Sequence, residues 1–372
     1  MSFVSTLQEL PMRRSASLAK FESLLSANVD LAALAARATN LTRQHFGRTM
    51  RLFAPLYLSN ECINSCAYCG FSRENPILRV TLDVDEVLAE AQHLAAQGFR
   101  NLLLVAGEHP KFVSNGYLGN CVRALRPMFS SIAIEVAPME TEDYLPIVDA
   151  GAEGLIVYQE TYDRAVYDSM HRAGPKQNFD WRLACPERAY AAGFTRLGIG
   201  ALFGLAPWRP DALALAAHTE YLLKKCWKAS LNISLPRLRP AAGEFRALHP
   251  LSDRELIQLV CAFRVTFPQI GITLSTRESS ALRNALAQVG VTMMSAGSHT
   301  EPGGYTGQGR AKIHRTVRGR IVPPEVPLPA DENATGQFQI DDTRSATEVA
   351  QALREFGLEP VWKDWDEALL PR

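Results

Sequence analysis

This sequence has no excess of positive or negative charge, and it has no long apolar run. Lysine plus arginine and aspartate plus glutamate each number 39 among the 372 residues, so the formal net charge is zero. Without a net field nothing favours a nucleic-acid partner, and a small-molecule partner is expected. The most apolar early stretch, residues 31–38, contains Arg37 and is far shorter than the roughly 20 apolar residues of a membrane span. We therefore expect a cytoplasmic protein without a signal peptide or membrane segment.

Cysteine is also scarce, with seven residues in the chain, and this argues against a disulfide framework. Four of the seven are isolated in helical or loop contexts: Cys121, Cys185, Cys226 and Cys261. Isolated free cysteines often behave as small buried hydrophobes, so we assign them no chemistry. A reducing compartment fits this distribution.

The other three cysteines, Cys62, Cys66 and Cys69, lie within eight residues, just after the apolar run 52–58. Iron–sulfur cubanes are held by cysteine thiolates, normally four of them. Three thiolates leave one iron without a protein ligand, and a small chelating molecule could bind there. The spacing Cys-x3-Cys-x-aromatic-Cys resembles the signature of the radical S-adenosylmethionine (radical SAM) superfamily.

A zinc site is the alternative use of these thiols. Structural zinc takes four ligands, which usually arrive as two pairs. No second cysteine pair follows Cys69. The ligand count therefore favours an iron–sulfur cluster over a zinc knuckle.

Short apolar runs alternate with longer helical patterns along most of the chain. Eight runs have the composition of buried strands: residues 52–58, 101–105, 132–136, 154–157, 197–201, 231–235, 272–275 and 291–296. The patterns between them, such as residues 84–96, 211–225 and 253–267, are amphipathic and of helix length. Apolar strands separated by helices indicate βαβ units and a parallel sheet. Eight strands predict an α/β fold, a (β/α)8 barrel of the TIM type.

The chain then divides into three expected parts. These are an N-terminal helical extension at residues 1–48, the barrel at residues 49–306, and a C-terminal loop insertion with a helical tail at residues 307–372. A Rossmann-type sheet is the alternative, but no GxGxxG opens a helix after the first strand. In a barrel the working residues lie at the carboxyl ends of the strands.

Polar side chains do occur at those strand ends. Tyr57 lies in the first run, Glu108 and Glu160 follow the second and fourth, Glu135 lies in the third, and Arg277 follows the seventh. The Ala-Gly-Glu that ends at Glu108 resembles the GGE motif of radical SAM enzymes, with alanine for the first glycine. One such residue alone would indicate a helix cap or a surface ion pair. Their repetition around one barrel mouth indicates a shared site.

At these residues the resemblance narrows to one family, 2-iminoacetate synthase, the tyrosine lyase of thiamine thiazole biosynthesis. It is carried by PLYLSN from Pro55, YCGF from Tyr68, LVAGEH from Leu104, VYQETY from Val157, LSTRE from Leu274, PGGY from Pro302 and PVWKDWD from Pro360. The resemblance runs from residue 41 to residue 369 and implies a radical SAM barrel.

The resemblance implies a definite reaction. Cys62, Cys66 and Cys69 would hold a [4Fe–4S] cluster whose fourth iron is chelated by SAM. An electron delivered through the cluster would cleave SAM to methionine and a 5′-deoxyadenosyl radical. The radical would take a hydrogen from the amino group of L-tyrosine, and the Cα–Cβ bond would break to give 2-iminoacetate (dehydroglycine) and p-cresol. The implied partners are thiazole synthase and a flavodoxin- or ferredoxin-type electron donor.

The resemblance also implies roles for further residues. The residues that would contact SAM are Tyr68, Glu108, Glu135, Glu160 and Arg182. The residues of the substrate pocket would be Tyr57, Arg277, Ser295 and Ser298. Arg277 is assigned to the substrate carboxylate, because a guanidinium fork matches a carboxylate bidentately. The alternatives are a salt bridge at the barrel rim for Arg277 and a turn cap for either serine.

Three other functions stay open at this point. The hydrogenase-maturing tyrosine lyase shares most of these segments but has a second cysteine cluster near its C terminus, whereas no cysteine follows Cys261 here. A tryptophan lyase of the same superfamily would use the same machinery. An iron–sulfur or zinc sensor without turnover would leave the charged strand ends without a common purpose.

Residues 307–341 depart from the shorter family members and look like an insertion before the last helix, at residues 347–356. The basic run at 310–320 could attract an acidic partner surface, but such runs are more often solvated loops. Four prolines between residues 323 and 329 indicate a linker-like extended segment. Trp362 and Trp365 are expected to form a tail that packs back on the barrel.

Overall fold

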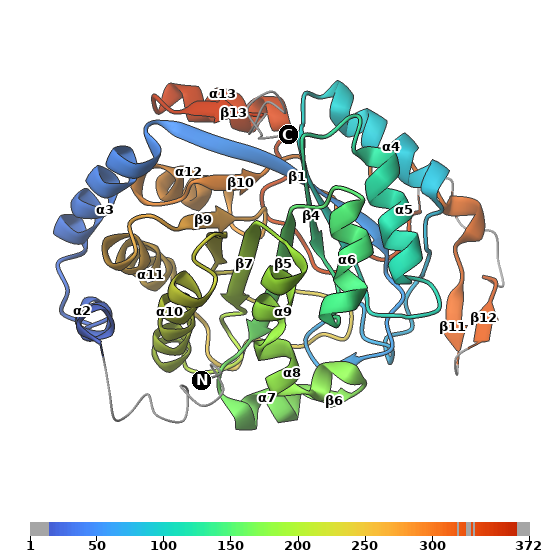
Figure 1. Cartoon of the computed structure of the whole chain (residues 1–372), viewed down its shortest axis with the longest axis horizontal. Coiled ribbons are helices and arrows are strands. Elements are labelled where there is room, and N and C mark those ends of the chain that lie inside the picture. The colour runs from blue at the N-terminus through green and yellow to red at the C-terminus, as the bar shows by residue number, and fades with distance from the viewer. Residues whose placement is uncertain (1–14, 318–319, 325–328, 330–331, 363–372) are drawn as a thin grey trace.

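A closed barrel of eight parallel strands forms the centre of the computed structural model, which describes residues 15–317, 320–324, 329 and 332–362 (Figure 1). The barrel strands in order are β1 (Thr49–Ser59), β3 (Asn101–Ala106), β4 (Ser131–Glu135), β5 (Gly154–Glu160), β7 (Arg196–Ala201), β8 (Ser230–Ser234), β9 (Gly271–Leu274) and β10 (Met293–Ser295). Parallel pairing of β10 with β1 closes the ring. The predicted (β/α)8 fold is confirmed, and each of the eight apolar runs contains a strand.

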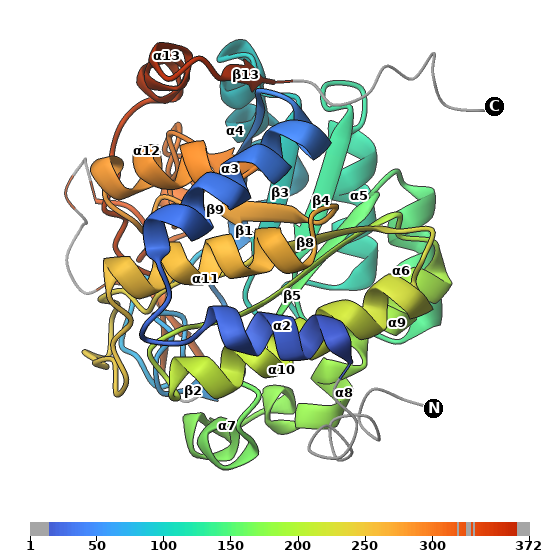
Figure 2. The ribbon, with the colours of Figure 1, turned by 90° about the vertical axis from the view of Figure 1, so that its left-hand side faces the viewer.

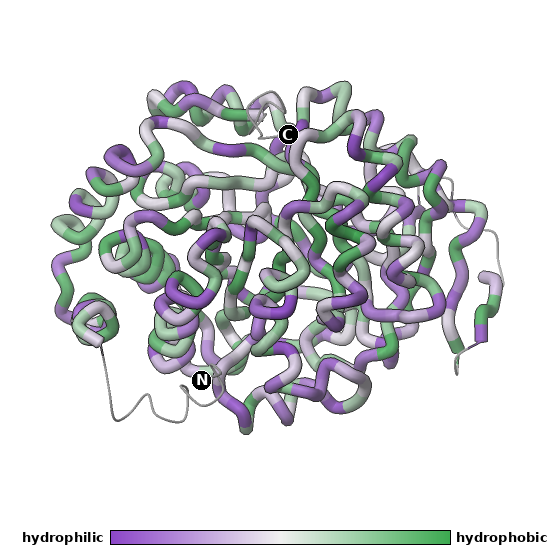
Figure 3. The backbone as a smooth tube through the Cα atoms, viewed as in Figure 1, coloured by the Kyte–Doolittle hydropathy of each residue, from purple (hydrophilic) through white to green (hydrophobic). Residues whose placement is uncertain are grey.

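Helices follow the strands and cover the outside of the barrel. They are α4 (Val84–Ala96), α5 (Asn115–Leu125), α6 (Thr141–Asp149), α9 (Cys185–Ala192), α10 (Trp208–Lys225), α11 (Asp253–Thr266) and α12 (Ser280–Val289). Their backbones alternate hydrophobic and hydrophilic residues in Figure 3, as helices with one buried face do. Helix α10 begins three residues before the predicted start, because Pro210 lies in the first turn, where a missing N–H is tolerated.

The N-terminal helices α2 (Ala16–Leu24) and α3 (Leu31–Phe46) lie across the outer helices (Figure 2). Phe21 packs against Phe263 of α11 with ring centroids 4.7 Å apart. Leu34 and Ala38 of α3 lie in a buried cluster with Cys261. Helices therefore do form in the expected N-terminal extension, and the apolar face of α3 covers α11.

The C-terminal segment returns to the barrel. After α13 (Ala346–Glu355), β13 (Glu359–Val361) pairs in parallel with the first residues of β1. Trp362 packs edge-on against Phe99 at 5.1 Å, and its carbonyl accepts hydrogen bonds from Arg100 and Asn101. The expected tail packing is confirmed for Trp362, whereas Trp365 lies outside the described residues.

Several short elements lie around the loop that carries Cys62, Cys66 and Cys69, here called the cysteine loop. They are β2 (Ser65–Cys66), α7 (Arg164–Met170), β6 (His171–Ala173), η1 (Pro175–Gln177), α8 (Phe179–Leu183), η2 (Arg310–Lys312) and the hairpin strands β11 (Arg315–Val317) and β12 (Arg320–Val322). Among the described helices, none is both long and apolar enough to cross a membrane. The four isolated cysteines are buried, as expected for small hydrophobes. The domain divisions at residues 48/49 and 306/307 stay a prediction.

Candidate active site

The cysteine loop follows the carboxyl end of β1 and is held from beneath by Arg79. This arginine is buried, and its guanidinium donates to the carbonyls of Asn60, Phe71 and Ser72 at 2.6, 3.2 and 2.8 Å. Asn60 is fixed in turn, since its side-chain amide donates to the Leu78 carbonyl at 2.8 Å. The loop therefore has a defined backbone path set by buried polar contacts.

A second set of contacts fixes the cysteine loop, from the segment between β5 and α8. Cys66 of β2 pairs with His171 of β6, and the Ala67 N–H donates to the Met170 carbonyl at 2.9 Å. Asn64 accepts a bond from the Lys176 N–H at 2.9 Å. The β5–α8 connection thus presses against the cysteines, which sequence spacing could not show.

The three thiols are unpaired with one another and partly or fully buried. Burial raises the pKa of Cys66 and Cys69, and the neighbouring thiols add to the rise. A strongly positive centre would be needed to hold them as thiolates. Within the described ranges no three His, Cys, Asp or Glu side chains converge on a point suited to a single metal ion. Each cysteine of a cubane binds a different iron atom, so this donor set of three separate thiols fits a [4Fe–4S] cluster.

Glu108 of the Ala-Gly-Glu motif lies against this loop. Its carboxylate accepts a 2.6 Å hydrogen bond from Asn64, whose amide is also 3.8 Å from the Cys62 sulfur. Gly107 is required here, because a Cβ atom would come within 2.3 Å of the Glu61 carbonyl oxygen. The motif brings a carboxylate next to the cysteines only because glycine lets two backbones touch.

A cavity of about 510 Å³, the loop cavity, opens on the inner side of the loop. It is lined by Tyr68, Cys69, Glu135, Tyr158, Glu160, Lys176, Leu202, Pro236, Leu238, Arg239, Arg277, Gln337 and Phe338. Glu160 lies in it beside two cations, with Lys176 Nζ at 2.7 Å and the Arg182 guanidinium at 3.5 Å. Although burial alone would raise it, these cations hold the pKa of Glu160 below its usual value. The cavity wall therefore carries fixed charges of both signs.

The direction in which the Glu160 side chain points depends on the backbone of β5. Its φ of 70° lies in the left-handed region, and the β5–β7 register shifts between Tyr158 and Glu160. Such a conformation costs on the order of 1–3 kcal/mol for a residue other than glycine, and strained residues of this kind cluster at functional sites. The bulge places Glu160 beside Lys176.

Tyr68, next to the third cysteine, is fixed by a buried histidine. His171 Nδ1 lies 2.8 Å from the Tyr167 carbonyl oxygen, which can only accept, so this nitrogen carries the proton. Burial lowers the pKa of His171 to about 3, so the ring is neutral and its Nε2 accepts from the Tyr68 hydroxyl at 2.8 Å. The aromatic face of Tyr68 is thereby held, with Lys176 Nζ 5.6 Å from its centroid.

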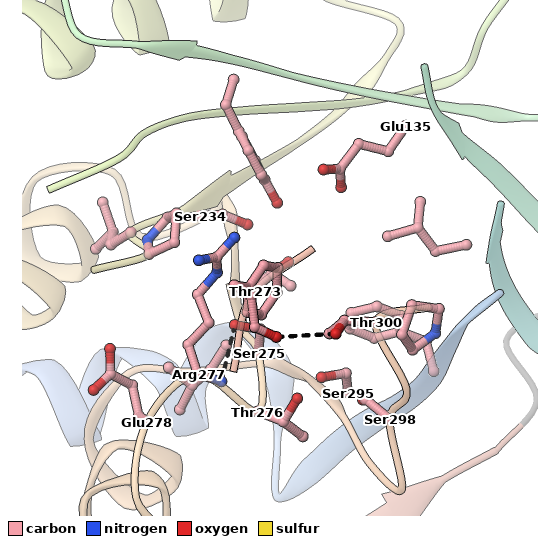
Figure 4. Close-up of a pocket in the computed structure, with 18 of the residues that line it drawn as sticks. Glu135, Ser234, Thr273, Ser275, Thr276, Arg277, Glu278, Ser295, Ser298 and Thr300 are labelled. Carbon is pink, nitrogen blue, oxygen red and sulfur yellow. Dashed lines mark hydrogen bonds between the residues drawn. The ribbon is translucent and has the colours of Figure 1, made fainter. Parts of the chain in front are cut away.

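A second cavity of about 830 Å³, the barrel cavity, lies inside the strand ends. Its wall is largely apolar and includes Phe53, Leu103, Val105, Leu256, Val260 and Ile272. Figure 4 shows Glu135 and Arg277 pointing into it, with Ser295 and Ser298 also on its wall. Both cavities are lined by Glu135, Tyr158, Pro236, Arg277, Gln337 and Phe338. A molecule in one would therefore lie next to a molecule in the other.

Arg277 is the most informative residue of the barrel cavity. Its guanidinium carbon lies 3.3 Å from the centroid of the Phe338 ring. Among the described residues no ion pair is found for Arg277, so the alternative of a rim salt bridge is wrong, although Glu135 and Glu160 act on it at longer range. Burial lowers the pKa of Arg277, as expected for a cation without a close counter-ion. An anionic ligand would supply that counter-ion.

Other polar groups of the barrel cavity are also poised for a ligand. The hydroxyls of Ser295 and Ser298 are buried and have no hydrogen-bond partner among the described residues, so neither caps a turn. Burial raises the pKa of Glu135 to about 7, even though Arg277 acts in the opposite direction. The Tyr57 hydroxyl donates to Gln337 at 2.8 Å. Buried groups without partners are what a bound polar molecule would satisfy.

The structure thus brings the predicted residues together in two adjoining cavities. Tyr57, Glu135, Arg277, Ser295 and Ser298 line the barrel cavity, and Tyr68, Glu135 and Glu160 line the loop cavity. Arg182 reaches the loop cavity through Glu160, and Glu108 lies apart from both, against Asn64. Their roles toward SAM and tyrosine stay proposals.

Four residues of the site were missed by sequence reasoning: Asn64, Lys176, Gln337 and Phe338. Asn64 lies between two of the cysteines, and a polar residue there was a usable signal. Lys176, Gln337 and Phe338 carry no local signal, because long chain crossings bring them to the cavities. Most of the proline segment at 323–329, predicted to be linker-like, lies outside the described residues, whereas the stretch 332–341 that follows it packs against the barrel mouth and lines the site.

Comparison with known proteins shows which family a chain with this site belongs to. The radical SAM superfamily profile matches residues 56–209, and the Biotin and Thiamin Synthesis associated domain matches residues 234–359. The 2-iminoacetate synthase of Escherichia coli is 42% identical over 337 residues, which cover 90% of this chain and 83% of that protein. The chain belongs to the 2-iminoacetate synthase family. It is therefore a radical SAM enzyme, and the cofactors of such enzymes are a [4Fe–4S] cluster and SAM.

Further relatives of this 2-iminoacetate synthase family member agree. The 2-iminoacetate synthase of Salmonella typhimurium is 40% identical, with the same coverage. The FeFe-hydrogenase maturase HydG from Carboxydothermus hydrogenoformans superposes with a TM-score of 0.82 at 33% identity, covering 96% of this chain and 79% of that one. Methylornithine synthase (PylB), at 20% identity and a TM-score of 0.70 over 95% and 96% of the two chains, shares the fold.

Proposed function

We propose that this enzyme cleaves the Cα–Cβ bond of L-tyrosine to give 2-iminoacetate and p-cresol. The observation that carries the proposal is Arg277, a half-buried cation without an ion-pair partner among the described residues, at the junction of an apolar cavity and the cavity beside the cysteine loop. A substrate that presents a carboxylate next to an aromatic side chain matches this arrangement. The likeness to 2-iminoacetate synthases at about 42% identity supports it.

The proposed cluster ligands are Cys62, Cys66 and Cys69, and SAM is assigned to the loop cavity. When bound, the reduced cluster and SAM supply the 5′-deoxyadenosyl radical that abstracts hydrogen from the substrate. The SAM contacts we propose are Tyr68, Glu108, Glu135, Glu160 and Arg182, with Lys176 added from the structure. Glu108 would contact SAM from the side of the cysteine loop, because a hydrogen bond from Asn64 holds its carboxylate there.

The chain itself orients the substrate. Arg277 would bind the carboxylate through two parallel N–H bonds, which fixes the direction of the amino group. The aromatic ring would then extend among the apolar side chains of the barrel cavity, near the unpartnered hydroxyls of Ser295 and Ser298. Glu135 faces both cavities and could accept a hydrogen bond from the substrate ammonium group or from the cofactor. This geometry presents the amino group toward the loop cavity.

Exclusion of water is the second task of the chain. The imine product hydrolyses readily, and the radical reacts with any nearby hydrogen donor, so a covered site is needed. We propose that thiazole synthase takes up the imine, that a flavodoxin- or ferredoxin-type protein delivers the electron, and that the enzyme works in the cytoplasm. The family resemblance supports these partners.

An anaerobic product assay tests the proposal. The protein is reconstituted with iron and sulfide, mixed with a reductant, SAM and L-tyrosine, and analysed by chromatography for p-cresol, 5′-deoxyadenosine and glyoxylate, the hydrolysis product of the imine. All three products are expected together. Deoxyadenosine without p-cresol would contradict the tyrosine assignment, and the same assay with L-tryptophan would then test the tryptophan lyase alternative.

A further inference from the structure

Residues 333–342, here called the roof segment, cross the barrel mouth between the two cavities. Backbone hydrogen bonds tie this segment to four separate places: Thr335 to Leu78, Gln337 to Thr300, Gln339 to Pro240 and Asp341 to Thr276, each at 2.9 Å. The Asp342 carboxylate pairs with Arg283, and both side chains are fully buried. The roof segment is therefore anchored at both of its ends.

Phe338 of the roof segment holds the plane of the Arg277 guanidinium. The ring centroid is 3.3 Å from the guanidinium carbon, so the ring covers one flat face of the cation. Stacking leaves the N–H groups at the edge of the plane free, and those are the groups that grip a carboxylate bidentately. The Phe338 carbonyl is itself fixed, because it accepts a 2.9 Å bond from the Thr300 hydroxyl.

Gln337 connects the roof segment to Tyr57 and to the cysteine loop. Its side-chain oxygen accepts the Tyr57 hydroxyl at 2.8 Å. Its backbone carbonyl packs so closely on Gly70 that a Cβ atom at Gly70 would come within 2.4 Å of it. Gly70 directly follows Cys69, so one residue contacts the barrel cavity and the cysteine loop together.

We propose that Phe338 and Gln337 are positioning residues for the substrate, Phe338 by fixing the carboxylate fork of Arg277 and Gln337 by fixing Tyr57. This inference rests on the proposed function and adds to it a segment that the sequence suggested was an insertion. Neither residue needs to touch a reacting atom. Their loss should weaken tyrosine binding and leave the cysteine loop able to bind its cluster.

The test compares Phe338→Ala with Phe338→Tyr and with Phe356→Ala, whose phenylalanine is an exposed side chain just after α13. L-tyrosine binding is measured by calorimetry on the cluster-loaded enzyme with SAM before reduction, and KM for tyrosine and for SAM is measured afterwards. We expect Phe338→Ala to weaken tyrosine binding about tenfold with little change in KM for SAM, since the cation–π contact that fixes the carboxylate fork would be lost. Phe338→Tyr and Phe356→Ala should match the wild type.

The same measurements can overturn the inference. Equal tyrosine affinity in Phe338→Ala and wild type would refute it, as would parallel losses of tyrosine binding, SAM binding and iron content, which indicate a structural role only. Gln337→Ala provides a second variant if Phe338→Ala does not fold. A wild-type enzyme that fails to bind tyrosine would instead contradict the proposed function.

A different observation concerns the exposed hairpin of β11 and β12, which stands at the right-hand edge of Figure 1. Its described apolar residues are unusually exposed, at 50% for Val317, 52% for Ile321 and 39% for Val322. Arg315 and Arg320 are also exposed, and neither has an ion-pair partner within the described part of the chain. Apolar side chains flanked by unpaired cations form a surface complementary to an acidic protein.

This hairpin is joined to the cysteine loop by a buried carboxylate. Glu61 directly precedes Cys62, and its oxygens lie 2.7 Å from His314 Nε2 and 3.2 Å from the Thr316 hydroxyl. The His314 N–H also donates to the Arg79 carbonyl at 3.0 Å. A protein seated on the hairpin would therefore lie beside the loop that needs an electron.

We infer that the β11–β12 hairpin is the docking surface for an acidic one-electron carrier protein. The carrier gives up one electron, which reduces the bound cluster, so the transfer balances without a further reactant. Opposite surface charges would speed encounter and make the rate fall with salt. Like the roof inference, this one rests on the proposed function.

The test uses an Arg315→Glu/Arg320→Glu double variant and, as a matched control, an Arg123→Glu/Arg354→Glu double variant of exposed arginines on α5 and α13. Each is assayed for p-cresol with an acidic flavodoxin and its reductase, and separately with dithionite. The hairpin variant should lose about tenfold in the flavodoxin-supported rate, lose its salt dependence and keep the dithionite-supported rate. The control should behave as the wild type in both.

Three results separate the possibilities. An unchanged flavodoxin-supported rate in the hairpin variant would refute the docking surface. Equal losses with flavodoxin and dithionite would also refute it, because the hairpin would then serve the fold alone, and an Arg315→Gln/Arg320→Gln variant checks this with a milder change. Absence of p-cresol from the wild type with dithionite would contradict the proposed function instead.

Discussion

Arg277 shows at the residue scale how a cation without a counter-ion defines a ligand. Glu135 and Glu160 act on this guanidinium at longer range, but it has no ion-pair partner among the described residues, and a partly desolvated cation is stabilised when an anion binds it directly. The stacking on Phe338 fixes the plane of the group but supplies no negative charge. The identity of the anion follows from the aromatic-sized apolar cavity that adjoins it.

An Arg277→Lys variant tests the carboxylate assignment. Lysine keeps the charge but cannot form the two parallel bonds of the fork or stack on Phe338, so KM for tyrosine should rise roughly tenfold or more. KM for SAM should change little. Steady-state kinetics of p-cresol formation decide this, and equal effects on both KM values would show that Arg277 is not a substrate clamp.

The titration of Glu135 gives a second prediction at the residue scale, on how stability depends on pH. Burial raises the pKa of its carboxyl in the folded protein to about 7, against 4.5 in the unfolded chain, and the charged groups that face it are Arg277, Glu160, Arg182 and Lys176. The folded state therefore binds a proton that the unfolded state releases between these two values. Stability due to this group is present below pH 4.5 and is lost as pH rises through about 7.

A Glu135→Gln variant tests whether Glu135 makes the protein less stable as pH rises. Glutamine stays neutral, so above pH 7 the variant should melt a few degrees higher than the wild type, and the difference should shrink as pH falls toward 4.5. Thermal unfolding of the metal-free protein, followed by circular dichroism across this range, measures the difference. A constant offset at every pH would mean that packing and not ionisation separates the two proteins.

At the scale of elements, the site depends on one short segment pressed against another. The cysteine loop and the β6–η1 segment meet at Gly174, where φ is +95° and a Cβ atom would come within 2.4 Å of the Asn64 side-chain oxygen. Asn64 in turn holds Glu108. A side chain at position 174 should therefore displace the loop that carries the cysteines.

Gly174→Ala should lower the iron content of the reconstituted protein, with a loss of stability of about 2 kcal/mol from backbone strain. Gly47→Ala is the matched control, because Gly47 also has a positive φ, of +64°, but no heavy atom within 4 Å of the added Cβ. The control should show strain without iron loss. Iron analysis and absorbance of the bound cluster make the comparison, and equal iron contents would remove the steric explanation.

At the scale of the whole molecule, the segment after α13 is joined to the first barrel strand. Strand β13 pairs with the start of β1, and Trp362 packs on Phe99. Trp362→Ala should therefore destabilise the fold by about 2 kcal/mol, less than a fully buried aromatic would. Thermal unfolding measures this, and Trp227→Ala, at a site 71% exposed, should be close to neutral. Similar shifts in both variants would show that the tail contributes little.

The eight strands were predictable because each is an apolar run long enough to be recognised locally, and strand order follows from right-handed parallel crossovers. The cysteines were predictable because their spacing is local. Arg277 and Glu135 were found because a barrel gathers the carboxyl ends of its strands. The division of the site into two cavities, and the residues that reach them from distant parts of the chain, needed the tertiary structure.

The sequence by itself determined the fold class, the cysteine loop and most of the polar strand ends, because these depend on short-range patterns and on the symmetry of the barrel. Tertiary structure alone decided the roles of Lys176 and the roof segment. Gln337 meets Tyr57 across 280 residues of chain, and Lys176 meets Glu160 only through a strained turn of the β5 backbone. Contacts of that kind are set by how the whole chain closes, which no local pattern encodes.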